Sequence, residues 1–106
     1  MNGKVNRAYA YYKAQYPASI LLFRVGNFYE AYLDDAEKIR ELLGSSQLKF
    51  AQHAQTVCLP SDNILECVSQ IDGSGCKIRL IEYRNDAGEY VIPDVECLES
   101  EKEMDY

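Results

Sequence analysis

The sequence of 106 residues predicts a single α/β domain in which about three helices flank a mixed β-sheet. Stretches with apolar residues at helical spacing alternate along the chain with short apolar or alternating stretches that are typical of strands. Proline, glycine and asparagine separate these stretches, and no Pro/Gly-rich linker or internal repeat divides the chain. The expected element order is α-β-β-α-β-α-β-β.

The first element is expected to be a helix, because apolar residues near the N-terminus recur at spacings of three and four. This apolar stripe consists of Val5, Ala8, Tyr9, Tyr12 and Tyr16. Pro17 ends the helix, since the residue before a proline is disfavoured in the α conformation.

Two strands are expected next. The run SILLFRV, residues 19–25, is short and continuously apolar, which predicts a strand buried on both faces. Gly26 and Asn27 interrupt the run, and FYEAYL, residues 28–33, can resume extended structure.

The stretch DDAEKIRELLG, residues 34–44, predicts a helix with capping signals at both ends. Asp34 can cap its first turn, with Glu37 as the capping-box partner. Gly44 suits the left-handed position that follows a helix. The residues expected to face inward are Ala36, Ile39 and Leu43.

The segment 47–60 alternates at Leu48 and Phe50 and again at Val57 and Leu59, which predicts one or two strands. A third helix is expected over residues 61–73, with Ser61 at its cap and Gly73 at its end. Its expected inward residues are Ile64, Leu65, Val68 and Ile71.

In the stretch CKIRLIEY, residues 76–83, apolar and basic residues alternate, which predicts a strand with one solvated face. Its expected inward residues are Cys76, Ile78 and Leu80, opposite Lys77 and Arg79. The segment RNDAGE has turn chemistry, and YVIP, residues 90–93, is expected to return as an antiparallel partner.

The formal net charge of −6 is unevenly distributed. Residues 1–50 carry 7 Lys/Arg and 5 Asp/Glu (+2), whereas residues 51–106 carry 4 and 12 (−8). We therefore expect a near-neutral domain over residues 1–93 and an acidic C-terminal tail over residues 94–106. A broadly basic surface, of the kind that contacts nucleic-acid phosphates, is absent.

No apolar run reaches the roughly 20 residues that a membrane span needs, and the N-terminus lacks the apolar core of a secretory signal. We expect a soluble cytoplasmic protein without a membrane partner. The cysteines, at positions 58, 67, 76 and 97, lack zinc-site spacing and are expected to be reduced thiols.

The sequence argues against an enzyme. It contains no GxxxxGK[ST] phosphate loop. His53 and Cys58 could serve as base and nucleophile, but both are explained as strand residues. Acidic pairs such as Asp34 and Asp35 could hold a metal ion, but the first is explained as a cap and the second by the helix dipole. No cofactor, metal ion or catalytic residue is expected.

The segment Phe28-Tyr29-Glu30 allows two interpretations. In a strand, Phe28 and Glu30 point to one side and Tyr29 to the other. Phe28 can be a core aromatic with Glu30 as a charge at the rim. Alternatively, a ring beside a carboxylate suits insertion next to a nucleobase, where the ring enters a deformable step and the carboxylate accepts a base N–H.

The stretch ILLFRVGNFYEAYLDDAEKIRELL, residues 20–43, resembles the N-terminal mismatch-recognition domain of the MutS family of DNA mismatch repair proteins. The features that carry the resemblance are Leu21-Leu22-Phe23, Gly26-Asn27-Phe28-Tyr29-Glu30, Asp34-Asp35-Ala36 and Leu42-Leu43. Residues 59–83 resemble the family's later turn, helix and strand more weakly. The resemblance covers about residues 4–84.

The resemblance implies a small mixed-sheet domain that binds mismatched or deformable double-stranded DNA without catalysis. In the family, the residue matching Phe28 stacks on the mispaired base from the minor groove, and the one matching Glu30 hydrogen-bonds that base. Asn27, Gly26 and Arg24 are the further expected DNA-binding residues.

Two departures from the family pattern are visible. Asn27 stands where the family usually has aspartate, and AQTVCLPSDN, residues 54–63, replaces the glycine-containing PMAGIPYHA stretch. The family's clamp and ATPase domains are not in this sequence, and a protein partner that supplies clamp or ATPase functions is among the expected partners. The alternative function is a protein-interaction adaptor that keeps the fold without binding DNA, through the acidic tail or the Tyr-rich first helix. An exposed Phe28 ring on a face with basic residues at its rim favours DNA, and a buried ring favours the adaptor.

Overall fold

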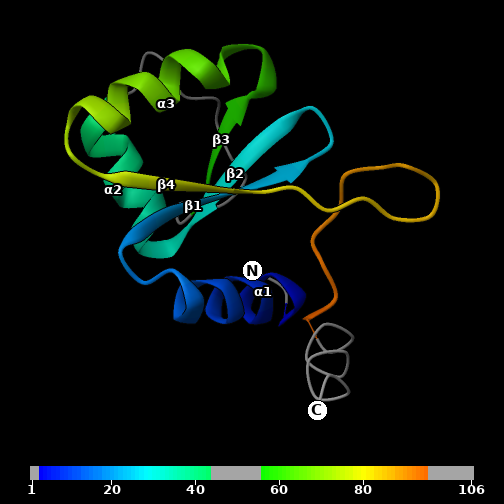
Figure 1. Ribbon diagram of the computed structural model, residues 1–106. Coiled ribbons are helices and arrows are strands. Elements are labelled where there is room, and N and C mark those ends of the chain that lie inside the picture. Colours follow the sequence, from blue (N-terminus) through cyan, green and yellow to red (C-terminus); the bar gives the residue numbers. More distant parts are fainter. Residues whose placement is uncertain (1–2, 44–55, 96–106) are drawn as a thin grey trace.

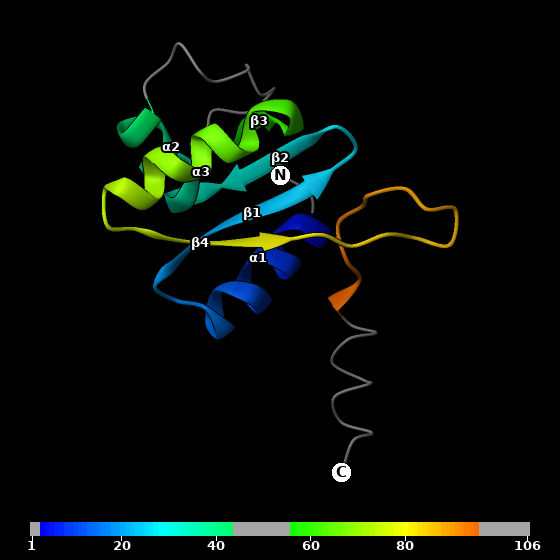
Figure 2. The ribbon, with the colours of Figure 1, turned by 45° about the horizontal axis from the view of Figure 1, so that its top comes forward.

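The structure, a computed structural model, describes residues 3–43 and 56–95. In these ranges a four-stranded sheet has the order β3-β2-β1-β4, with helices on both of its faces (Figures 1 and 2). The strands are β1 (Ser19–Val25), β2 (Phe28–Tyr32), β3 (Thr56–Pro60) and β4 (Lys77–Ile81). The helices are α1 (Gly3–Gln15), α2 (Leu33–Leu43), the short 3-10 helix η2 (Ser61–Asn63) and α3 (Ile64–Gly73).

The sheet is mixed. β2 pairs antiparallel with both β1 and β3, whereas β4 pairs parallel with β1. A two-residue loop, Gly26 and Asn27, joins β1 to β2, and Gly26 has a φ of 59°. This left-handed conformation at the first loop position matches the twist of a hairpin and favours glycine.

Two apolar clusters cover the two faces of the sheet. On the face of α2 and α3, the cluster includes Ile20, Leu22, Tyr29, Ile39 and Ile71. On the face of α1, it includes Ala8, Tyr9, Leu21, Phe23, Tyr32 and Val95. Consecutive β1 residues thus alternate between two cores, which confirms the prediction of a strand buried on both faces.

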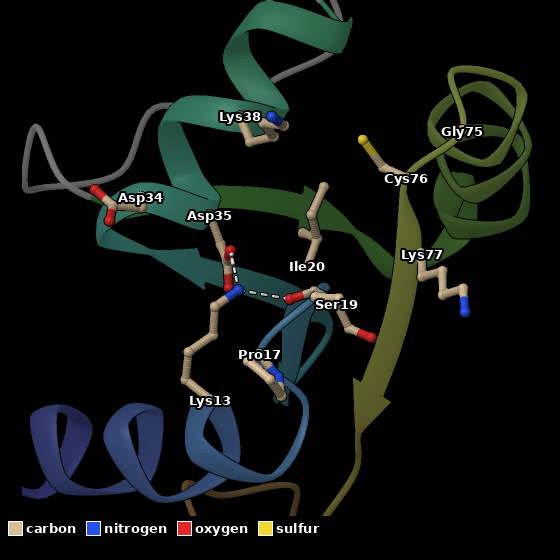
Figure 3. A pocket seen from close by; sticks show the side chains of 11 residues that line it. Lys13, Pro17, Ser19, Ile20, Asp34, Asp35, Lys38, Gly75, Cys76 and Lys77 are labelled. Carbon is tan, nitrogen blue, oxygen red and sulfur yellow. Dashed lines mark hydrogen bonds and ion pairs between the residues drawn. The ribbon is translucent and has the colours of Figure 1, made fainter.

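The carboxylate of Asp35 connects three elements (Figure 3). Asp35 is 4% exposed, and one of its oxygens accepts a hydrogen bond from the backbone N–H of Leu21 at 3.1 Å. The other accepts from the Lys13 ammonium at 2.8 Å, which also donates to the carbonyl oxygen of Ser19 at 2.6 Å. Burial raises the pKa of Tyr9 to about 12, and the negative charge of Asp35 adds to this shift.

The chain passes from β2 into α2 without a connecting loop. The β1–β2 ladder ends at the pair Phe23–Glu30, and the N–H of Leu21, further back on β1, binds Asp35. Leu33, the residue at the junction, has a φ of 54°, which is strained for a branched side chain. The hydrogen bonds of Asp35 stabilise this turn, since they hold the first turn of α2 against β1.

Most predicted elements are confirmed, and the structure corrects four details. α2 begins at Leu33, so Asp34 lies within its first turn and not at a cap before it. Ser61 belongs to η2, and the residue capping α3 is Asn63, without a side-chain cap hydrogen bond. The prediction of a final strand over residues 90–93 is wrong. Within the described residues, this segment forms only the isolated bridge between Arg84 and Tyr90.

The fourth correction concerns two residues expected to face inward. Leu65 is 81% exposed and Leu80 is 39% exposed. Leu65 lies in the first turn of α3, and Leu80 lies on the edge strand β4, where the sheet is incompletely covered. Gly44, Leu48, Phe50, His53, Cys97 and the tail from 96 onward lie outside the described residues.

Asp35→Ala is expected to lower the free energy of unfolding by about 2–4 kcal/mol, because it leaves a buried N–H unpaired and removes the partner of a partly buried ammonium. Asp34→Ala is the matched control: Asp34 is the exposed neighbour and should cost less than about 1 kcal/mol. Urea denaturation of both variants measures the difference. Equal losses would contradict the role assigned to Asp35.

Candidate nucleic-acid interface

Phe28 is the first residue of β2 and lies at the base of the β1–β2 hairpin loop. It is 40% exposed, whereas Phe23, the other phenylalanine of this hairpin, is 1% exposed. Phe28 lies between Val25 of β1 and Pro60 of β3 in the sheet register. The backbone of Phe28 is therefore paired on both sides, and its ring is not enclosed by the core.

Glu30 follows on the same face of β2 and is half-buried. One of its oxygens accepts a hydrogen bond from the hydroxyl of Tyr32 at 2.8 Å. The other is 3.8 Å from the thiol sulfur of Cys58, which lies opposite Glu30 on β3. Tyr29 and Ala31 point to the opposite face and are buried there, so the alternation expected of FYEAY is confirmed.

Both groups that contact Glu30 remain protonated donors at neutral pH. Burial raises the pKa of Tyr32 well above its ordinary value, and the negative charge of Glu30 raises it further. Burial likewise raises the pKa of the Cys58 thiol to about 11, with Glu30 as the second cause. The arrangement is a carboxylate held by two O–H or S–H donors beside an exposed aromatic ring.

Arg24 is engaged within the domain. Its guanidinium lies 5.1 Å from the centre of the Tyr29 ring and 4.3 Å from that of the Tyr90 ring. It also lies 3.7 Å from a carboxylate oxygen of Glu82, and its Nε donates to the carbonyl oxygen of Gly26 at 2.8 Å. These contacts hold the hairpin against the segment that follows β4.

Gly26 and Asn27 form the tip of the hairpin, and both are exposed. The N–H of Gly26 donates to the carbonyl oxygen of Tyr90 at 3.3 Å, and the carbonyl oxygen of Asn27 accepts from the N–H of Ser61 at 3.0 Å. The tip is thus tied to η2 and to the loop after β4, which lies beside the hairpin in both ribbon views (Figures 1 and 2). These backbone hydrogen bonds, together with the one that Arg24 donates to Gly26, position the tip.

The charges of the loop after β4 do not form a basic rim. Arg84 stacks on the Tyr90 ring at 4.4 Å, on the same loop as Glu82, Asp86 and Glu89. Together with Arg24, these residues carry two positive and three negative formal charges, a balance of −1. The exposed ring expected of a DNA contact is present, and the loop beside the hairpin, taken together with Arg24, is not basic.

A hollow of about 410 Å³ lies at the opposite end of β1 from the hairpin (Figure 3). It is bounded by the end of α1, the first turns of α2, and the starts of β1 and β4, with Lys13, Asp35, Lys38, Cys76 and Lys77 among its lining residues. Because β1 runs from Ser19 at this hollow to Val25 at the hairpin, the two features lie at opposite ends of the sheet. Lys13 and Asp35 form an ion pair with each other. These two lining residues of the hollow therefore stabilise the fold.

Within residues 3–43 and 56–95, no group of three or more His, Cys, Asp or Glu side chains is placed to hold a metal ion. No helix among the described residues has the length and apolar character needed to cross a membrane.

Residues 4–99 match the family model of MutS domain I. The chain belongs to the MutS domain I family. The match extends beyond the stretch of the hairpin and α2 in which the sequence motifs are concentrated, and it includes β3, α3 and β4. The mixed sheet with helices on both faces is consistent with this membership.

Three relatives, each named DNA mismatch repair protein MutS, show the extent of the similarity. The protein of Thermosipho melanesiensis is 35% identical over 77 residues, which is 73% of this chain and 9% of the relative. That of Parabacteroides distasonis is 35% identical over 78 residues, 70% of this chain and 9% of the relative. That of Streptococcus uberis is 61% identical over 31 residues, 29% of this chain and 4% of the relative. The chain thus spans less than a tenth of the length of these relatives.

Two residues at the MutS-type motif were not found from sequence: Tyr32 and Cys58. Tyr32 could have been noticed, because residues i and i+2 of a strand share a face and Tyr32 is two residues after Glu30. Cys58 could not, because its position opposite Glu30 depends on the register between β2 and β3.

Phe28→Ala is expected to lower the free energy of unfolding by less than about 1.5 kcal/mol, because much of the ring is already in contact with water. Phe23→Ala, the matched substitution in the core, should cost about 3–5 kcal/mol. Thermal and urea denaturation of the two variants provide the comparison. Similar losses in both would place Phe28 in the core and remove the basis for a contact role.

Proposed function

We propose that this domain binds mismatched or otherwise deformable double-stranded DNA, in the cytoplasm and without catalysis, in a mismatch repair process. Its membership of the MutS domain I family and the names of its relatives support this proposal. The observation that carries it is the exposed ring of Phe28, held at the end of the sheet with the Glu30 carboxylate on the same face.

The two side chains have different proposed roles. The ring of Phe28 enters the base stack at a weakened step, where unstacking costs least. The carboxylate of Glu30 accepts an N–H of the displaced or mispaired base. A properly paired duplex resists the wedge and has no base N–H free for Glu30, so it binds less well.

The other candidate residues support this contact. Gly26 and Asn27 form the exposed tip that would lie along the sugar-phosphate backbone, and the absence of a side chain at Gly26 allows a close approach. Arg24 holds the hairpin in place through Tyr29, Tyr90 and Glu82. We assign Arg24 to positioning the interface, because its guanidinium is already engaged.

Binding by this domain alone is expected to be weak. Phosphate contacts supply a large share of the affinity of DNA-binding proteins, and the charged residues of the loop beside the hairpin, taken together with Arg24, have a balance of −1. We propose a protein partner with clamp or ATPase functions as a source of further DNA contacts. We propose a recognition domain over residues 1–93 and an acidic extension over 94–106, of which Val95 is buried against the cluster under α1.

Titration of labelled duplexes at low salt tests the proposal, with a mismatched and a fully paired duplex of otherwise identical sequence. The wild-type chain should prefer the mismatched duplex, and Phe28→Ala should reduce that preference about tenfold or more, because aromatic–base stacking contributes about 1–3 kcal/mol. Tyr83→Ala is the control, since Tyr83 is a comparably exposed aromatic (36%) outside the hairpin.

Loss of preference in Phe28→Ala but not in Tyr83→Ala supports the wedge. A wild-type chain that binds both duplexes equally, or neither, contradicts the proposal and favours a protein-binding adaptor with the same fold.

A further inference from the structure

The carboxylate of Glu30 has a defined orientation before any ligand is present. The Tyr32 hydroxyl donates to one oxygen and the Cys58 thiol lies at the other, so both oxygens have a neighbour that fixes their direction. An exposed glutamate on a strand surface would otherwise sample several rotamers.

The hydroxyl of Tyr32 is itself rigidly placed. Tyr32 is 2% exposed, and its ring packs against Phe23 at 5.4 Å and edge-on against Tyr9 at 6.5 Å between ring centres. Only the hydroxyl end reaches Glu30, at 2.8 Å. The position of the donor is therefore set by the aromatic cluster beneath α1, on the same face as Phe28.

We propose that Tyr32 is a positioning residue for DNA recognition: its hydroxyl holds the Glu30 carboxylate in the orientation in which it accepts a base N–H. This inference rests on the proposed function. Cys58 assists from β3 through the weaker S–H contact at 3.8 Å.

The hydrogen-bonding capacity of Glu30 is compatible with this role. A carboxylate offers about four lone-pair positions on its two oxygens, and the two donors occupy one on each. Each oxygen keeps capacity for a further donor. Because Tyr32 and Cys58 are donors here, they leave the acceptor character of the carboxylate intact while reducing its freedom, which lowers the entropic cost of forming the bond to the base.

A purely structural role for the Tyr32 hydroxyl makes a different prediction. If the hydroxyl only satisfied a half-buried carboxylate, its removal would lower stability and leave the choice between duplexes unchanged. If it positions Glu30, its removal reduces discrimination even under conditions where the variant is fully folded.

Tyr32→Phe tests the inference, because it removes only the hydroxyl and keeps the ring in the core. The preference for the mismatched over the paired duplex should fall about fivefold, and the affinity for the paired duplex should stay within about twofold of wild type. Tyr9→Phe is the matched control: Tyr9 is buried in the same cluster, but its hydroxyl lies by Asp35 and not by Glu30. This control should leave the preference unchanged.

A double-mutant cycle tests whether the Tyr32 hydroxyl affects the preference for mismatched DNA through Glu30. In a Glu30→Ala background, Tyr32→Phe should change the preference no further, because a positioning residue has no effect once the group it positions is gone. An additive effect in the double variant would overturn the inference, as would an unchanged preference in Tyr32→Phe alone.

The failures of the two proposals are distinguishable. One outcome is that the wild type prefers mismatched DNA and that Phe28→Ala removes this preference whereas Tyr32→Phe does not. In that case the proposed function stands and the positioning role of Tyr32 is wrong. If the wild type shows no preference, both are wrong.

Discussion

The buried carboxylate of Asp35 holds elements from both sides of the sheet together. It accepts hydrogen bonds from the backbone of β1 and from the ammonium of Lys13 at the end of α1, while its own backbone lies in the first turn of α2. One buried group therefore joins the helix on one face of the sheet to a helix on the other. It also pairs the N–H of Leu21 at the point where β2 leaves the sheet, and an unpaired N–H there would cost about 1–3 kcal/mol. With this end of the hairpin held, the strained Leu33 can turn the chain directly into α2.

The candidate interface lies at the other end of β1 and β2, at the hairpin. Since β2 is held at Tyr32 and paired with both β1 and β3, the alternation of its side chains places Phe28, Glu30 and Tyr32 on one face. Tyr32 lies deep under α1, Glu30 is half-buried, and Phe28 is 40% exposed. Burial thus decreases along the strand toward the hairpin tip. The exposed ring is presented by a paired strand and not by a free loop, so contact with DNA would require little ordering of the protein.

The parts predicted from sequence are those decided by local patterns. The continuous run of β1, the alternation of FYEAY and the apolar spacing of α2 each depend on residues close together in the chain, and the structure confirms them. The predictions that were wrong concern residues whose environment depends on which surfaces are covered in the folded domain. Leu65 and Leu80 fit an apolar pattern but lie at the start of a helix and on an edge strand. The sequence explains Asp35 only by the helix dipole, since its partners, Lys13 and the N–H of Leu21, are distant in sequence. Cys58 meets Glu30 only through the register of β2 and β3.

In the proposed function, the hairpin end of the sheet contacts DNA, and the lysine-lined hollow at the other end does not. Backbone amide chemical-shift mapping of the 15N-labelled chain, with a mismatched duplex added at low salt, tests it most directly. We expect the largest shifts at residues 26–30 and at Cys58 on the neighbouring strand, with Lys38 and Lys77 at the hollow nearly unchanged. Shifts concentrated at Lys38 and Lys77, with residues 26–30 unaffected, would contradict it.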